Sequence, residues 1–204
     1  MTFRLTERSN PRFKILGLSH VAIVVSDMKR TVDFYQGILG FPLIKTTALG
    51  KGDGQHSFFD MGDGQSSLAF FYFPTARPAE QGVTIPKKNV GVFTPGQPGG
   101  FVTAVGSLNH IAFNVESDAL LEYKAKLEAA GIFVAPVLGH YDDDRPPSER
   151  RTAEGTWLRS IYFRDPDGIQ LEFACWGRPM TDADVNLEPA TSDTVSPELH
   201  RVPG

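Results

Sequence analysis

The chain has 204 residues, of which 41% are hydrophobic and 22% charged, with a net charge of −4 at pH 7; this is ordinary for a globular protein that buries its own core. The acidic balance argues against a nucleic-acid partner or an anionic membrane surface, which need clustered Lys and Arg. Cys175 is the only cysteine, so an intramolecular disulfide is excluded. The polar first residues and the absence of a long apolar run predict a cytoplasmic protein without a membrane-spanning segment.

Two segments of the chain are similar to each other. GLSHVAIVVSD at residues 17–27 recurs as GSLNHIAFNVESD at residues 106–118, and the two histidines, His20 and His110, are 110 − 20 = 90 residues apart. Because repeats of one supersecondary unit stack on each other, we expect equivalent strands to place both histidines at equivalent points of one shared cavity.

The first copy predicts a β-α-β-β-β module. Residues 15–25 alternate as in a strand, Ser26 is the predicted helix cap, and the amphipathic stretch after it ends at Gly40. Three further strands are predicted at residues 41–46, 56–61 and 67–73.

The second copy predicts the same order of elements. Residues 108–115 are predicted as a strand, and Ser117 as the cap of a helix that ends at Gly131. Further strands are predicted at residues 133–137, 156–164 and 169–176.

The predicted fold class is therefore α+β: two β-α-β-β-β modules that form one curved mixed sheet, a half-barrel, around a metal site. The boundaries divide residues 1–176, a single two-module domain, from a polar tail. The predicted parts are module one at 13–74, a Pro- and Gly-rich linker at 75–106, module two at 107–176 and the tail at 177–204.

An acidic residue stands inside an otherwise apolar strand. In QLEFACW, Glu172 shares a face with Gln170 and Ala174, and a buried carboxylate is costly unless it is paired or bound to a cation. Two imidazoles and one carboxylate are the ligands of the facial triad that holds Fe(II) with open positions. A closed structural zinc site would need four ligands, usually thiolates.

With these residues the chain resembles the vicinal oxygen chelate superfamily, which includes glyoxalase I, extradiol dioxygenases and fosfomycin-resistance proteins, over roughly residues 13–176. The resemblance implies that His20, His110 and Glu172 are the metal ligands. It also implies that Ala69 stands where glyoxalase I has a fourth ligand, which makes glyoxalase I less fitting.

The segment YFRDPDGIQLE, residues 162–172, matches the aromatic part of the dioxygenase signature, which implies that Tyr162 orients the substrate. The signature's upstream histidine falls at residues 153–155 and the acid-base histidine at Ser66, so both are missing. His56 and His140 are candidates to replace them, since imidazole titrates near working pH. Each of these residues also has a structural explanation, because buried histidines and tyrosines commonly pack and hydrogen-bond in cores.

The leading hypothesis is a metal-dependent enzyme similar to extradiol dioxygenases, with one divalent metal per chain, Fe(II) first and Mn(II), Ni(II) or Zn(II) as alternatives. The second is Lewis-acid chemistry of the glyoxalase or fosfomycin-resistance type, as a lyase, isomerase or thiol transferase. The third is a protein that binds and sequesters a drug-like molecule. We expect a small-molecule substrate with two oxygen donors, such as a catechol or an α-oxo compound, and a homodimer.

Overall fold

Each half of the chain folds into a strand, a helix and three further strands. The computed structural model describes residues 14–51, 53–76, 108–142 and 154–184. Almost all of the predicted linker, and the predicted tail beyond Asp184, lie outside these residues.

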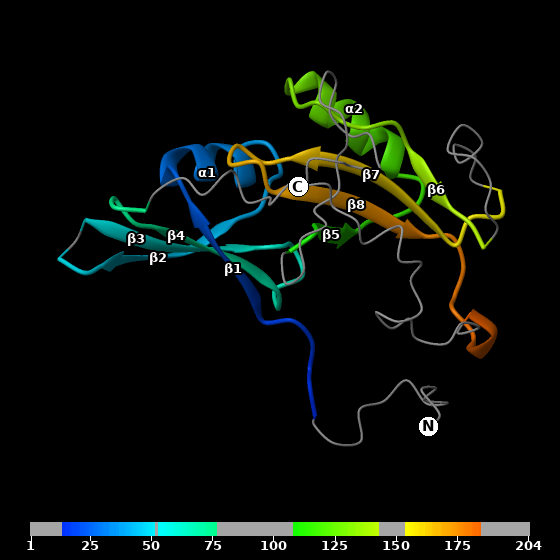
Figure 1. Ribbon diagram of the computed structural model, residues 1–204, viewed down its shortest axis with the longest axis horizontal. Helices are drawn as coiled ribbons and strands as arrows, with labels where there is room; N and C mark the ends of the chain where they lie inside the picture. Colours follow the sequence, from blue (N-terminus) through cyan, green and yellow to red (C-terminus); the bar gives the residue numbers. More distant parts are fainter. Residues whose placement is uncertain (1–13, 52, 77–107, 143–153, 185–204) are drawn as a thin grey trace, which may run out of the picture. The chain divides into compact units, whose positions relative to one another are not determined.

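Module one forms a four-stranded mixed sheet in the order β1-β4-β3-β2 (Figure 1). β1 runs parallel to β4, and the other two pairs are antiparallel. Its elements are β1 (His20–Val25), α1 (Met28–Tyr35), β2 (Leu43–Leu49), β3 (Gly54–Asp60) and β4 (Ser67–Tyr72).

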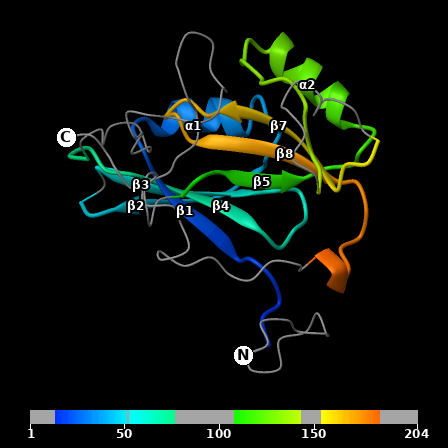
Figure 2. The same ribbon diagram turned by 45° about the vertical axis from the view of Figure 1, so that its right-hand side comes forward.

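Module two repeats this topology in the order β5-β8-β7-β6 (Figure 2). β5 is parallel to β8, the counterpart of β1 and β4. Its elements are β5 (Ile111–Asn114), α2 (Leu120–Ala129), β6 (Leu138–His140), β7 (Leu158–Arg164) and β8 (Gln170–Trp176), and a 3-10 turn η2 (Asp182–Asp184) follows.

The predicted α+β fold of two β-α-β-β-β modules is confirmed, and each module keeps its own four-stranded sheet. The strand predicted at residues 133–137 is wrong, because the strand of this region is β6, a few residues later. Pro136 has no N–H to donate to a ladder, and the segment makes only a single backbone bond to β7 from Ala135 N–H to the Tyr162 carbonyl (2.9 Å) among the described backbone contacts.

Both predicted helix caps are wrong. Asp27 is the cap of α1, since its side chain accepts the Arg30 N–H at 3.0 Å, and Ser26 instead donates to Asp167 of module two through its backbone N–H and its hydroxyl. α2 begins after Ala119, which makes no side-chain cap bond. A cap motif in sequence is local, whereas Ser26 is used by a contact 141 residues away.

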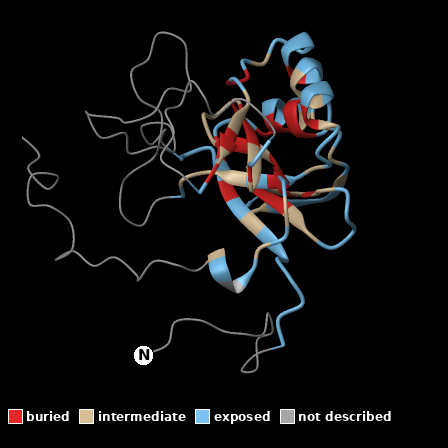
Figure 3. Ribbon diagram, turned by 90° about the vertical axis from the view of Figure 1, so that its right-hand side faces the viewer, coloured by how far each residue is buried: buried red, intermediate tan, exposed pale blue. Residues whose placement is uncertain are grey.

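The core lies on the helix side of each sheet. In β1, Ile23 and Val25 are buried while Val24 between them is 55% exposed, as expected for a strand with one covered face. Figure 3 shows the buried positions gathered in the strands, while most of α2 is exposed.

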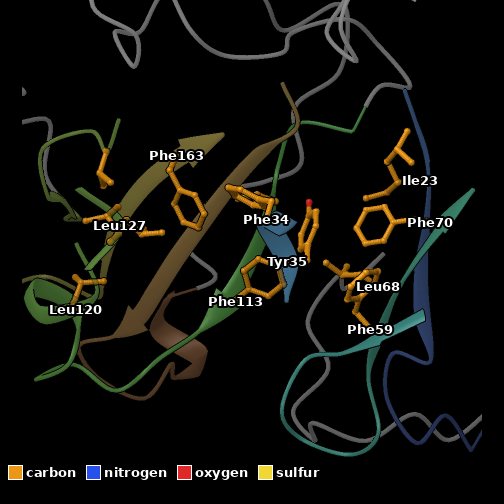
Figure 4. Packing of buried hydrophobic residues seen from close by; sticks show 14 of the residues in the cluster. Ile23, Phe34, Tyr35, Phe59, Leu68, Phe70, Phe113, Leu120, Leu127 and Phe163 are labelled. Carbon is orange, nitrogen blue, oxygen red and sulfur yellow. The ribbon is translucent and has the colours of Figure 1, made fainter. Parts of the chain in front are cut away.

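Helix α1 links the two modules. Figure 4 shows Phe34 and Tyr35 between Phe113 and Phe163 of module two and Phe70 of module one, and all five belong to one cluster of buried apolar side chains. The sheets therefore meet through α1, and the strands β1 and β5 are not neighbours in either sheet. Among the described helices, none is long and apolar enough to cross a membrane.

Candidate metal centre

His110 and Glu172 lie side by side on neighbouring strands of module two. β5 and β8 are paired so that Ala112 stands opposite Glu172, which brings the preceding His110 within reach. His110 Nε2 is 2.7 Å from Glu172 Oε2. The carboxylate is 2% exposed, and its second oxygen, Oε1, has no hydrogen-bond partner.

This pair fits two adjacent ligands of one cation. Ligand atoms ~2.1 Å from a metal and separated by a right angle are ~3.0 Å apart, which is close to the observed 2.7 Å. His110 Nδ1 is 2.6 Å from Asn109 Oδ1. This contact orients the ring and, with a metal bound in place of the proton on Nε2, would keep the other proton on Nδ1. The unpartnered Oε1 is the kind of buried atom that a metal would satisfy.

Glu172 is ionised despite its burial. Burial by itself raises the pKa of a carboxyl, but hydrogen bonds from His110 and Ser160, with a smaller contribution from Tyr162, outweigh it and lower the pKa of Glu172. Conversely, burial and the charge of Glu172 raise the pKa of Tyr162. The phenol therefore stays protonated and can donate a hydrogen bond at neutral pH.

His20 does not join these two residues in the same chain. It starts β1 in module one, is exposed, and its Nδ1 is 3.1 Å from Ser19 Oγ. Among the described residues, no group of three His, Cys, Asp or Glu side chains gathers closely enough to hold a metal. Within the part of the chain that the structure describes, packing around α1 joins the sheets and β1 does not pair with β5, so His20 is not grouped with His110 and Glu172 within one chain.

The strand registers confirm Ala69 as the counterpart of Glu172. Ala69 pairs with Ala22, two residues after His20, and Glu172 pairs with Ala112, two residues after His110. Ala69 is fully buried and has no donor atom in its side chain. Module one therefore offers a histidine without a carboxylate beside it.

Known proteins agree with this architecture. Residues 17–173 match the family model of the Glyoxalase/Bleomycin resistance protein/Dioxygenase superfamily. The chain belongs to this superfamily. Its members include many metalloenzymes, typically bind a divalent metal and often form dimers.

Several solved members of the superfamily resemble this chain. The protein SMU.1112c is 27% identical, with a TM-score of 0.50, over 79% of this chain and 99% of its own. The glyoxalase family protein from Enterococcus faecalis is 25% identical, with a TM-score of 0.50 and the same coverage of 79% and 99%. The fosfomycin-resistance protein FosX from Listeria monocytogenes, solved with Mn(II) and sulfate, is 21% identical with a TM-score of 0.47, over 79% of this chain and 93% of its own.

His56 lies on the same face of its sheet as His20. In the strand registers His56 stands opposite Phe71, and Phe58 opposite Ala69, so these side chains share the face that carries His20, which we call the site face of module one. His56 stacks on Phe71 at 3.7 Å, and its Nε2 is buried with no partner. Burial, and to a smaller extent the nearby His20, lower the pKa of His56.

His140 lies on the corresponding face of module two. Its Nε2 is 3.3 Å from Ser160 Oγ, and Ser160 is two residues from Tyr162 and therefore on the same face of β7. This face, the site face of module two, also carries His110, Gln170 and Glu172. The Tyr162 ring meets the His110 ring edge-on at 5.7 Å.

The sequence analysis gave no role in the site to three polar residues on or beside this face. Asn109 orients His110, and Ser160 contacts His140 and lowers the pKa of Glu172. Gln170 is 4% exposed, and neither of its amide atoms has a hydrogen-bond partner. Alternation along β8 already placed Gln170 on the face of Glu172, and the same alternation along β7 could have found Ser160, which is two residues from Tyr162.

Proposed function

We propose that this protein is a divalent-metal-dependent enzyme whose centre is formed by His110 and Glu172 of one copy and His20 of a second copy. The observation that carries the proposal is the buried Glu172 carboxylate, which faces His110 Nε2 and has an unsatisfied oxygen. An anion so placed is stabilised by a cation.

The second copy follows from where His20 lies. His20 is held as His110 is, with a side-chain oxygen of the preceding residue at its Nδ1. It stands on a face with exposed apolar residues, Ala22 and Val24, and the ring of Phe58 is near it at 5.7 Å. The site face of module two from another copy would cover these residues and bring the missing ligands.

The reaction that these residues support best is extradiol cleavage of a catechol-type substrate. Two histidines and one carboxylate leave several coordination positions open, and Ala69 adds no fourth ligand. A bound Fe(II) would supply Lewis acidity and a place for two substrate oxygens and for dioxygen. Tyr162, which stays protonated, would donate a hydrogen bond to a substrate oxygen.

A base must accept the substrate's hydroxyl proton. His56 and His140 are the candidates, from the two site faces. The lowered pKa of His56 keeps its imidazole neutral near pH 7, and its buried Nε2 has no partner, so it can take up a proton. His140 is already in contact with Ser160.

A second candidate function is Lewis-acid chemistry on an epoxide, α-oxo or epimerisable substrate. Its support is the sequence Ala153-Glu154-Gly155, which holds no histidine where the dioxygenase signature has one. A metal with the same three ligands could serve either reaction.

The test uses protein purified without oxygen and loaded with Fe(II). Oxygen uptake is measured with catechol, 3-methylcatechol and protocatechuate, and the proposal expects uptake matched by loss of substrate. Glu172→Gln should remove both bound metal and uptake, whereas Glu122→Gln, which changes an exposed carboxylate, should leave both intact. If Glu172→Gln binds as much metal as the wild type, Glu172 is not a ligand and the proposed metal centre is wrong. Metal binding without oxygen uptake, with equal turnover of an epoxide or α-oxo substrate under Mn(II), favours the second function.

A further inference from the structure

The repeat offers two equivalent contacts between the modules, each between the helix of one module and a hairpin turn of the other. Side chains fill one of these contacts and leave a cleft at the other. At the first, the turn between β7 and β8 docks on α1: Tyr35 Oη donates to Asp165 at 3.1 Å, and Arg30 donates to the Pro166 carbonyl at 2.9 Å. Tyr35 is fully buried, so the contact has no free space.

The counterpart of Tyr35 in module two is Leu127. The Tyr35 carbonyl accepts the N–H of Phe41, the residue after Gly40, and the Leu127 carbonyl accepts the N–H of Ile132, the residue after Gly131. Both glycines have positive φ, 75° and 79°, and each bond closes the turn that leads out of the helix, over six residues in module one and five in module two. Leu127 therefore occupies in module two the helix position that Tyr35 occupies in module one.

The counterpart of Asp165 in module one is Met61. Asp165 N–H bonds the Ile169 carbonyl and closes the β7–β8 hairpin, as Met61 N–H bonds the Ser66 carbonyl and closes the β3–β4 hairpin. The hydrogen-bonded pair of tyrosine and aspartate is thus replaced by two apolar side chains that are smaller or more flexible.

The serine that anchors the filled contact is replaced as well. Ser26, six residues after His20, donates to Asp167. The residue six after His110 is Glu116, and the serine of the second copy, Ser117, comes one residue later. A carboxylate cannot donate to the acidic turn of module one, where the Asp63 carboxylate instead accepts N–H groups of its own turn. The second contact consequently stays open.

A cleft of about 560 Å³ lies at this place, a size typical of small-molecule sites. Leu127 and Met61 both line it. Four aromatic rings form a continuous wall, with Phe41 5.2 Å from Phe113, Phe113 6.1 Å from Phe173, and Phe173 5.8 Å from Tyr123, each pair edge-on. Asn114, Glu116 and Lys126 supply polar groups.

We propose that this inter-module cleft binds a neutral aromatic molecule of one or two rings that carries a hydroxyl group. The equivalent space in the other contact is occupied by a phenol ring with its hydroxyl bonded to a carboxylate, and the ring wall offers an aromatic guest the edge-to-face contacts that Tyr35 makes there. The opposite charges of Glu116 and Lys126 favour a neutral guest. The site is separate from the metal centre, because Phe173 and Glu172 are successive residues of β8 and point to opposite faces.

The experiment titrates 2-naphthol into metal-free protein labelled with [methyl-13C]methionine. Met61 lines the cleft, while Met28, a buried residue in the first turn of α1, serves as the internal reference. Saturable shifts of the Met61 methyl, with a Kd on the order of 0.1 to 1 mM, are expected, with Met28 unmoved. If the Met61 signal does not respond at several times this concentration, the proposal is overturned. The same result is expected if another part of the chain fills the cleft, which also overturns the proposal.

Variants test where the molecule binds. Leu127→Phe fills the cleft from its floor, and Ile38→Trp fills it from a partly exposed rim position that tolerates a large side chain. Each should weaken binding at least tenfold. Leu121→Phe adds the same ring at a 60% exposed position of α2 and should bind as the wild type does. Unchanged affinity in both filling variants overturns the location, and equal affinity for decahydro-2-naphthol overturns the aromatic class.

Discussion

Tyr35 Oη donates a hydrogen bond to Asp165 Oδ2 across 3.1 Å, and both residues are buried. The bond joins the helix of module one to a hairpin turn of module two. Asp165 Oδ1 also accepts the N–H groups of Asp167 and Ile169, at 2.9 and 2.8 Å. One carboxylate thus shapes the turn and docks it on the other module.

Tyr35→Phe should destabilise the protein by about 1 to 2 kcal/mol, because a buried acceptor loses its donor while the ring keeps its packing. Urea unfolding measures the change. Tyr72→Phe, in a partly buried strand position, is the matched control and should stay within about 0.5 kcal/mol. Equal effects of the two variants would mean that the bond contributes nothing to the docking.

Asp165→Asn should change the pH dependence of stability. Burial raises the pKa of Asp165 to about 6, against the hydrogen bonds it accepts. The folded state therefore holds this proton more tightly than the unfolded state. The contribution of this carboxyl to the free energy of unfolding is largest below about pH 4 and is lost as the pH rises to about 6. The variant, compared with the wild type, should gain stability between pH 4 and pH 7 by about 1 to 3 kcal/mol. A difference that is constant with pH contradicts the raised pKa.

His20→Ala and Glu172→Ala should each abolish metal binding, yet a mixture should partly restore it. If the ligands come from two copies, a mixed dimer keeps one site with all three ligands. After equal amounts are unfolded and refolded together, about one quarter of the wild-type metal content should return, because about half of the dimers are mixed. Metal analysis checks this. No recovery, in dimers shown to be mixed, would place all ligands in one copy.

Ala69→Glu should tighten metal retention and suppress oxygen uptake at least tenfold, since it offers a fourth ligand and closes an open position. Dialysis against a chelator and an oxygen electrode measure the two effects. Ala48→Glu, at an exposed position of β2, should change neither. If Ala69→Glu retains metal and consumes oxygen as the wild type does, Ala69 does not face the metal.

Tyr162→Phe should lower turnover by about 10- to 100-fold with metal content unchanged, because its phenol donates to the substrate and is not a ligand. Steady-state oxygen uptake and metal analysis separate the two. His56→Ala and His140→Ala, assayed in the same way, ask which imidazole accepts the proton. A loss of metal in Tyr162→Phe would instead show that the phenol supports the centre through Glu172.

The sequence by itself determined the repeat, the order of elements and the faces of the strands. The alternation around Glu172 and the matched positions of His20 and His110 come from a period of two and a duplicated module, both of which are local properties. The counterpart relationship between Ala69 and Glu172 could also be read from aligned turns, since hairpin closure fixes the register of the strands after them.

Only the tertiary structure decided how the modules meet. Strand pairing through β1 and β5 would have put His20 beside His110, whereas packing through α1 buries Tyr35 against Asp165 and leaves His20 apart from Glu172. No local pattern distinguishes these arrangements, because the alternation along a strand indicates which face is buried and not which element packs beside the strand. The choice depends on contacts between residues more than 100 positions apart, such as Ser26 with Asp167. These contacts can stabilise the protein only when both modules have folded.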